Sequence, residues 1–178
     1  MKITLVRHGQ TEENYKNVIQ GLKNNLLNET GRRQCWKLRE RLKNETFDFC
    51  YMSPLVRTVE TAMILIGDRV EMIPDKRLIE RDMGQLDGTE RSKYDAKKYW
   101  DYDLNCTELG VEAIQSIFER CQSFLTYILE KYDDSAHILI VSHGAPIRVL
   151  HHLLQKSSLT KNLLDIEIDN CYCKTYIV

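Results

Sequence analysis

Residues 2–9 read Lys-Ile-Thr-Leu-Val-Arg-His-Gly, a short apolar and β-branched run that ends in a charged segment. Such a run is typical of a buried strand that leads into a loop. Residues 138–144 repeat the pattern as Ile-Leu-Ile-Val-Ser-His-Gly. Open α/β sheets bind ligands at the carboxyl ends of their strands, and both His-Gly pairs follow a strand. We therefore expect His8 and His143 to converge on one crevice.

Helices with one apolar face separate the expected strands. The apolar spacing predicts helices over residues 30–42, 54–66, 111–132 and 144–154, and further strands over residues 47–52, 70–73 and 171–178. Ser53 is predicted to be the N-cap of the second helix, with Pro54 in its first position. Strands that alternate with helices indicate an α/β fold, here a three-layer α/β/α sandwich around a mainly parallel sheet.

The length of 178 residues fits one domain, and residues 1–178 are expected to form a single domain because no boundary interrupts the pattern. The irregular segment, residues 77–105, is polar and carries turn signals at Gly84 and Gly88. It is predicted to be a small loop-rich insertion over the active site, with one helix near residues 90–100.

The composition argues against several classes of function. The 25 Lys and Arg are scattered among 26 Asp and Glu, for a net charge of -1, which leaves no basic stripe for nucleic acid. The longest apolar stretches are too short to cross a bilayer, and the first residues lack the apolar segment of a signal peptide. We therefore expect a cytoplasmic protein, a monomer or homodimer, that binds neither nucleic acid nor membrane.

The cysteines show neither the paired spacing of a zinc site nor the density of a secreted disulfide scaffold. They are Cys35, Cys50, Cys106, Cys121, Cys171 and Cys173. Most are expected to be reduced. Cys171 and Cys173 could be a metal or redox pair, but alternate positions on a strand explain their spacing better. No metal and no other cofactor is expected.

Two arginines suggest an anionic ligand beside the histidines. A guanidinium group pairs with phosphate oxygens through two hydrogen bonds and keeps its charge at any working pH. Arg7 directly precedes His8, and Arg57 lies near the start of the helix after Pro54, whose dipole also favours an anion. The alternative for Arg57 is a pair on the helix surface with Glu60, three residues further along.

Four motifs occur in order along the chain. They are Arg-His-Gly-Gln-Thr-Glu-Glu-Asn at residues 7–14, Ser-Pro-Leu-x-Arg-Thr-x-Glu-Thr at residues 53–61, Leu-x-Glu-x-x-x-Gly-x-x-x-Gly at residues 78–88 and Ser-His-Gly at residues 142–144, with Gly21 after the first. Together they resemble the histidine phosphatase superfamily, in its phosphoglycerate-mutase-like branch. The resemblance spans residues 3–148.

The resemblance implies roles for individual residues. In that family the His of the first motif becomes phosphorylated, which implies that His8 is the nucleophile and that a phosphohistidine is the intermediate. His143 would complete the pocket, and Glu80 would be the proton donor. The implied phosphate and substrate site consists of Arg7, Asn14, Gln20, Gly21, Arg57, Arg81 and Gly144.

These residue types suit phosphoryl transfer. A neutral imidazole nitrogen attacks phosphorus in line, provided that a hydrogen bond holds the other ring nitrogen as N–H. The transition state spreads charge over three oxygens, which two arginines and a protonated His143 would stabilise without a metal. Glu80 would have to be protonated to release the alcohol, and it would then act as base on the attacking water.

Three functions remain open: hydrolysis of a small-molecule phosphomonoester, bisphosphoglycerate-dependent phosphoglycerate mutase activity, and phospho-ligand binding without catalysis. The mutases carry Glu-Arg-His-Tyr-Gly around the acid, whereas residues 80–84 read Glu-Arg-Asp-Met-Gly. We therefore expect a phosphatase. The aromatic residues that could form an apolar mouth, or simply pack, are Tyr94, Tyr99, Trp100 and Tyr102.

Overall fold

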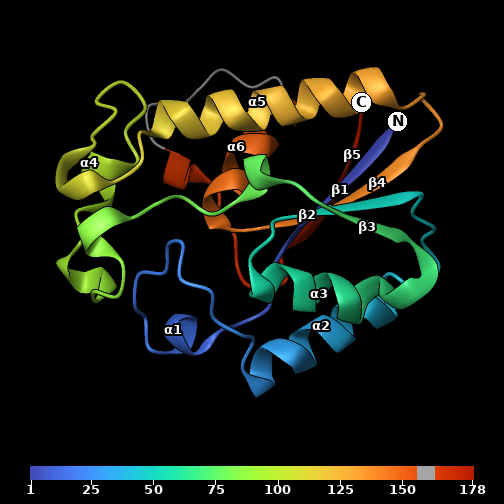
Figure 1. Ribbon diagram of the computed structural model, residues 1–178, viewed down its shortest axis with the longest axis horizontal. Coiled ribbons are helices and arrows are strands. Elements are labelled where there is room, and N and C mark those ends of the chain that lie inside the picture. Colours follow the sequence, from blue (N-terminus) through green and yellow to red (C-terminus); the bar gives the residue numbers. More distant parts are fainter. Residues whose placement is uncertain (156–162) are drawn as a thin grey trace.

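The computed structural model describes residues 1–155 and 163–178, and within them five strands form one twisted sheet (Figure 1). The strands are β1 (Lys2–Arg7), β2 (Phe49–Met52), β3 (Glu71–Pro74), β4 (His137–Ser142) and β5 (Cys173–Ile177). Their order is β3-β2-β4-β1-β5; the first four are parallel, and β5 runs antiparallel to β1. The predicted α/β fold with a mainly parallel sheet is confirmed.

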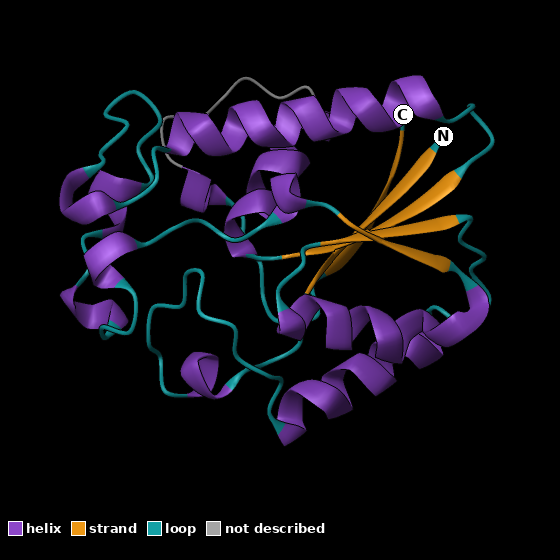
Figure 2. Cartoon of the chain, viewed as in Figure 1, coloured by secondary structure: helices purple, strands orange, loops and turns teal. Residues whose placement is uncertain are grey.

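Helices cover both faces of the sheet (Figure 2). One layer contains α2 (Glu29–Arg41) and α3 (Val56–Ile66), and the other contains α5 (Ile114–Lys131) and α6 (Gly144–Gln155). None of these described helices is long and apolar enough to span a bilayer. The three-layer arrangement leaves the ends of the strands open for a site.

The central strand β4 is apolar on both of its faces. Ile138 and Ile140 belong to the core cluster under α5 and α6, whereas Leu139 and Val141 belong to the cluster under α2 and α3. All four side chains are fully buried. This pattern is required of a parallel strand that has a helical layer on each side, and it explains why the segment reads as a continuous apolar run.

The start of α3 differs from the prediction. Ser53 is not its N-cap: the helix begins at Val56 after Leu55, which has an extended backbone and makes no side-chain cap. The Ser53 hydroxyl instead accepts a hydrogen bond from the Leu55 N–H and contacts His143. A tertiary contact has therefore replaced the local cap that the Ser-Pro pair predicted.

Other boundaries move by a few residues. The strand predicted over 47–52 begins at Phe49, the long helix predicted over 111–132 begins at Ile114, and Cys171 lies before β5 rather than within it. Cys171 has φ 58°, a left-handed conformation that does not continue a strand. Helix and strand ends depend on caps and turns, which the apolar periodicity does not report.

The insertion over residues 77–105 is largely made of single turns. It contains the short helix α4 (Ala96–Tyr99), which is less than the helix predicted over 90–100, and 3₁₀ turns at Lys76–Leu78, Gly84–Leu86 and Arg91–Lys93. A small apolar cluster that includes Met83 and Tyr99 holds it together. Figure 1 shows α4 beyond the carboxyl ends of the strands, on the same side as α1 (Glu12–Tyr15).

Candidate active site

His8 and His143 lie together at the carboxyl edge of the sheet. His8 follows β1 and His143 follows β4, and these strands are neighbours in parallel register, with Arg7 opposite Ser142. The centroids of the two rings are 5.2 Å apart in an edge-on arrangement. Both side chains are buried, at 1% and 0% exposure. Two equivalent positions on adjacent strands thus bring two imidazoles to one point.

The tautomer of His8 follows from one hydrogen bond. Its Nδ1 lies 2.7 Å from the backbone carbonyl oxygen of Gly9, which can only accept, so Nδ1 carries the ring proton. Burial, reinforced by the charges of Arg7 and Arg57, holds the pKa of His8 well below its usual value. The ring is therefore neutral near pH 7, with a lone pair on Nε2.

His143 is oriented by Ser53. Its Nε2 lies 2.7 Å from the buried Ser53 hydroxyl. The hydroxyl oxygen accepts from the Leu55 N–H at 3.3 Å, and within the described residues Nε2 is the one acceptor found for the hydroxyl proton, so we assign that proton to the bond with Nε2. Nδ1 then carries the ring proton. Burial and the charge of Arg57 lower the pKa of His143 well below its usual value. The ring is thus neutral without ligand, and the protonated His143 expected in the transition state stays a prediction.

Arg57 is a buried residue of the site rather than a surface residue. It is 0% exposed, and its terminal nitrogens donate to the carbonyls of Gly21 at 2.9 Å and Lys23 at 2.7 Å. Burial lowers its pKa to about 10. Glu60 accepts from Arg32 at 2.6 Å instead, so the alternative pair of Arg57 with Glu60 does not form. The Gly21 backbone therefore positions Arg57.

Arg7 extends from the end of β1 into the same region. One terminal nitrogen donates to the Ile168 carbonyl at 2.5 Å, and burial lowers the pKa of Arg7 to about 10. Asn14 closes the capping box of α1, and its Oδ1 also accepts from Asn170 at 3.1 Å. The same Asn170 amide donates to the His8 carbonyl at 3.1 Å. The C-terminal segment therefore holds Arg7, His8 and Asn14 together.

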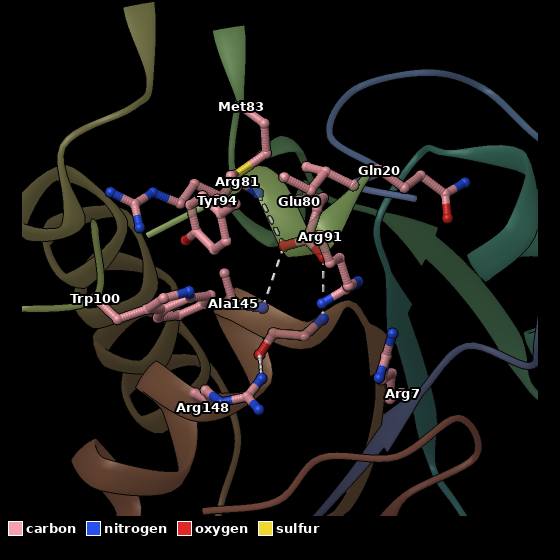
Figure 3. A pocket seen from close by; sticks show the side chains of 12 residues that line it. Arg7, Gln20, Glu80, Arg81, Met83, Arg91, Tyr94, Trp100, Ala145 and Arg148 are labelled. Atoms are coloured by element: carbon pink, nitrogen blue, oxygen red, sulfur yellow. Dashed lines mark hydrogen bonds between the residues drawn. The ribbon is translucent and has the colours of Figure 1, made fainter. Parts of the chain in front are cut away.

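Glu80 connects the insertion to the N-terminus of α6. Its two carboxylate oxygens accept from the backbone N–H groups of Gly144 and Ala145, each at 3.1 Å. Figure 3 shows the carboxylate between Arg81 and the start of this helix. Free N–H groups at a helix N-terminus attract anions, which explains the position of the carboxylate. Glu80 is thereby fixed within the cavity that it lines.

A cavity of about 100 Å³ opens beside these groups (Figure 3). Its lining residues are Arg7, Ile19, Gln20, Glu80, Arg81, Met83, Arg91, Tyr94, Trp100, Gly144, Ala145 and Arg148. Four of them are arginines and one is a carboxylate. His8 and His143 are buried, and each is the chain neighbour of a lining residue, Arg7 or Gly144. Because four lining side chains are arginines and one is a carboxylate, the cavity is strongly cationic.

Several buried donors around the cavity lack acceptors. Within the described residues, no hydrogen-bond partner is found for Arg7 Nε, Gln20 Nε2, Arg57 Nε, Arg81 Nη2, His143 Nδ1 and Arg148 Nε. An unsatisfied buried donor costs about 1–3 kcal/mol, so native proteins keep few of them. Their concentration at one place indicates a site for a ligand rich in acceptor oxygens.

A sequence model of the histidine phosphatase superfamily (branch 1) matches residues 3–176. The chain belongs to this superfamily. Membership confirms the resemblance drawn from the motifs. Among relatives of this histidine phosphatase are proteins named as phosphatases and proteins named as mutases.

The histidine phosphatase is 33% identical over 167 residues to phosphoglycerate mutase-like protein 4 of Arabidopsis thaliana, covering 88% of this chain and 72% of that protein. It is 30% identical over 168 residues to phosphoserine phosphatase 1 of Hydrogenobacter thermophilus, covering 90% of this chain and 79% of that protein. The structure of phosphoserine phosphatase from Entamoeba histolytica in complex with 3-phosphoglyceric acid matches with a TM-score of 0.80 and 26% identity. The match covers 98% of this chain and 89% of that chain. The family match and the relative named as a phosphatase support phosphoester hydrolysis, by a phosphatase enzyme, as the general activity.

Sequence reasoning missed three residues of this histidine phosphatase site. Ser53 directly follows β2, so its place at the carboxyl edge of the sheet was a usable signal. Arg148 lies one helical turn after Gly144, which also could have shown that it faces the site. Arg91 lies in the irregular insertion, where no periodicity predicts the direction of a side chain.

The aromatic residues of the insertion divide into two groups. Tyr94 and Trp100 line the cavity, and the guanidinium carbons of Arg81 and Arg148 lie 5.5 and 5.3 Å from the Trp100 ring centroid. Tyr99 stacks against Tyr94 in the small cluster. Tyr102 packs edge-on against Phe118 of α5, with 5.0 Å between ring centroids. Two of the four candidates therefore contribute to the cavity, and the other two to packing.

Proposed function

We propose that this histidine phosphatase hydrolyses a small-molecule phosphomonoester through a phosphohistidine on Nε2 of His8. The observation that carries the proposal is the 2.7 Å hydrogen bond from Nδ1 of His8 to the Gly9 carbonyl. It keeps the proton on Nδ1 and leaves Nε2 as the nucleophile, as covalent catalysis by an imidazole requires. The lowered pKa of His8 favours the same neutral ring.

Three groups are placed to stabilise the transferred phosphoryl group. Arg7, Arg57 and His143 each have a buried donor nitrogen without an acceptor in the described chain. A phosphoryl group in its transition state carries negative charge on three oxygens, and donors fixed in advance lower its energy most effectively. Because two guanidinium groups supply the positive charge, we propose that hydrolysis needs no metal ion.

Glu80 is the proposed general acid and base. It lines the cavity beside Arg7, and its orientation is held by the N–H groups of Gly144 and Ala145. When protonated, it would transfer its proton to the ester oxygen as the bond to phosphorus breaks. As a carboxylate it would then take a proton from the water that attacks phosphohistidine. The N–H contacts keep it in place for both steps.

The lining of the cavity favours a substrate whose alcohol part is small and carries a negative charge. Arg81, Arg91 and Arg148 lie outside the set of groups assigned to the phosphoryl group, and they would pair with a carboxylate or second phosphate. Glu80 is the single carboxylate among the lining residues. Met83 and Trp100 provide the apolar contacts for a short carbon skeleton.

Hydrolysis is favoured over mutase activity by the residues after Arg81. Asp82 is exposed and its carboxylate accepts from the Gly84 N–H at 2.8 Å within its own turn, whereas Met83 is buried and lines the cavity. Neither offers the polar contacts of the His-Tyr pair that the mutases carry here. Binding without catalysis is disfavoured because nucleophile, phosphate donors and carboxylate are all present together.

The test is release of phosphate from p-nitrophenyl phosphate and from a panel of small phosphomonoesters, with and without EDTA, by the wild type and by His8→Ala. We expect unchanged turnover in EDTA and loss of turnover, to less than about one hundredth, in His8→Ala. Full activity of His8→Ala, or loss in EDTA, would contradict the mechanism. Faster interconversion of 2- and 3-phosphoglycerate than hydrolysis would establish the mutase. Phosphate-ester binding without any turnover would establish the binding module.

A further inference from the structure

Two cysteine sulfurs lie close together near the segment after β1 that contains His8 and Gly9, called the histidine loop below. The Sγ atoms of Cys35 and Cys171 are 3.6 Å apart, although the residues are separated by 136 positions in the chain. Cys35 belongs to α2 and is fully buried, whereas Cys171 precedes β5 and is partly exposed. A disulfide bond is about 2.0 Å long, so the two sulfurs would have to approach by about 1.5 Å. This is within reach of a small movement of the turn that carries Cys171.

We propose that Cys35 and Cys171 are a redox pair, and that an oxidant of the peroxide class joins them in a disulfide that lowers catalytic activity. In the first step the Cys35 thiolate accepts the proton of the Cys171 thiol, whose sulfur attacks one peroxide oxygen. An S–O bond forms, the O–O bond breaks, and the displaced hydroxide takes that proton from Cys35 and leaves as water. In the second step the Cys35 thiolate attacks that sulfur, the S–S bond forms, and the S–OH oxygen leaves as a second water. The two thiols lose two electrons, and the peroxide gains them.

The two sulfurs suit these different steps. Cys171 is a partly exposed residue whereas Cys35 is fully buried, so we expect Cys171 to meet the oxidant first. The hydrogen bond from the Cys171 thiol lowers the pKa of Cys35, whereas the same hydrogen bond and burial raise the pKa of Cys171. Cys35 is therefore the thiolate of the pair, which suits it to take the Cys171 proton in the first step and to attack in the second. Once the disulfide has formed, the partly exposed Cys171 is the side from which another thiol can approach it. A reductant that opens the structure, or a small dithiol, would reverse it.

Cys35 lies directly against the histidine loop. A Cβ atom added to Gly9 would be 2.8 Å from its sulfur, so the helix and the residue after His8 are in contact. The Thr61 hydroxyl lies 3.7 Å from the same sulfur and accepts from the Gly9 N–H at 3.1 Å. The Gly9 carbonyl is the acceptor that fixes the His8 tautomer. A change in the position of Cys35 therefore acts on the nucleophile.

Cys171 reaches the same loop from the other side. Its N–H donates to the His8 carbonyl at 3.3 Å, and the preceding Asn170 donates to that carbonyl and to Asn14. Three residues earlier in the chain, the Ile168 carbonyl holds the Arg7 guanidinium. Pulling Cys171 toward α2 would displace these anchors together. A misplacement of about 1 Å at a catalytic centre costs up to about a hundredfold in rate, so a marked loss of activity is expected.

The experiment treats the reduced full-length protein with hydrogen peroxide and follows two readouts, peptide mapping under non-reducing conditions and hydrolysis of p-nitrophenyl phosphate. We expect a linked peptide pair containing Cys35 and Cys171, a fall in kcat/KM of about tenfold or more, and recovery with dithiothreitol. Cys35→Ala and Cys171→Ser should each retain their own untreated activity after peroxide. Cys173→Ser, which removes a neighbouring thiol outside the pair, should respond as the wild type does.

The activity readout rests on the proposed function, whereas the disulfide does not. Absence of the Cys35–Cys171 linkage in treated wild type, or linkage of Cys171 to Cys173 instead, would overturn the redox pair. Linkage without loss of activity would overturn the regulation. No hydrolysis by the untreated, reduced protein would be a failure of the proposed function, and peptide mapping would still decide the disulfide. Because Cys171 is partly exposed, Cys171→Ser keeps the test valid if Cys35→Ala does not fold.

Discussion

The Ser53 hydroxyl lies 2.7 Å from Nε2 of His143 and links the end of β2 to the loop after β4. Because Nε2 is the one acceptor found for the Ser53 O–H among the described residues, Ser53 gives its proton to His143, and the N–H of that ring is on the other nitrogen. The donor nitrogen of His143 is thus buried without a partner in the described residues. Ser53, which the sequence predicts to be a helix N-cap, is therefore a positioning residue for the imidazole of His143.

Substituting Ser53→Ala should weaken this control of the tautomer. We expect kcat for p-nitrophenyl phosphate to fall about tenfold, with a smaller change in KM, because the phosphoryl group loses a correctly oriented donor mainly in the transition state. Nitrogen NMR of the His143 ring should change from a single Nδ1–H tautomer to a mixture. Ser142→Ala removes another buried hydroxyl, which donates to the Leu78 carbonyl, and serves as the matched control. Equal losses in the two variants would mean that Ser53 acts only through stability.

The buried, neutral state of His8 should make stability depend on pH. Burial lowers the pKa of His8 in the folded state, so below about pH 6.5 the unfolded chain binds a proton that the folded ring does not. The free energy of unfolding therefore decreases as the pH falls. Between about pH 7.5 and about pH 5.5, His8 should lower the free energy of unfolding by about 1.4 kcal/mol, and the His8→Asn variant should not show this decrease. The measurement is urea unfolding of both proteins at each pH; parallel pH dependence would exclude a buried neutral His8.

Glu80→Gln should separate substrates by their leaving groups. The amide keeps the shape of the side chain but cannot donate a proton as an acid or act as a base. We expect kcat/KM for alkyl phosphates to fall by about a hundredfold or more, and kcat/KM for p-nitrophenyl phosphate by less, since kcat/KM reports the transfer to His8 and nitrophenolate leaves without a proton. Rapid-quench kinetics should reveal accumulated phosphohistidine. An equal loss for both ester types would leave Glu80 with a binding role alone.

Two of the arginines that line the cavity, Arg91 and Arg148, should select for an anionic alcohol. Phosphoserine and phosphoethanolamine differ by one carboxylate, so the ratio of their kcat/KM values reports recognition of that group. We expect Arg91→Gln and Arg148→Gln each to reduce this ratio by about tenfold, because a charge-assisted contact is worth about 1.5–3 kcal/mol. Lys93→Gln is the control, since Lys93 pairs with Glu90 and does not line the cavity. An unchanged ratio in both arginine variants would contradict the proposed preference for a substrate whose alcohol part is negatively charged.

Much of the fold could be predicted from short segments of sequence. The continuous apolar run at residues 137–142 coincides with β4, because a central parallel strand is buried on both faces and has no polar positions. The two His-Gly pairs were placed at one edge of the sheet for the same reason: parallel strands end together. The start of α3 could not be found in this way, since Ser53 has two possible partners for its hydroxyl and only one is local.

The sequence by itself therefore determined which strands form the sheet and that His8, His143, Arg7 and Arg57 could share a phosphate site. The tertiary structure decided the rest: the pairing of Ser53 with His143, the arrival of Arg91 and Arg148 at the cavity, and the contact between Cys35 and Cys171. The physical reason is range. Burial of one face of a helix or strand produces a regular spacing of apolar residues that the sequence shows directly. Contacts between residues 90 or 136 positions apart depend instead on how separate layers pack, and they produce no regular spacing in the sequence.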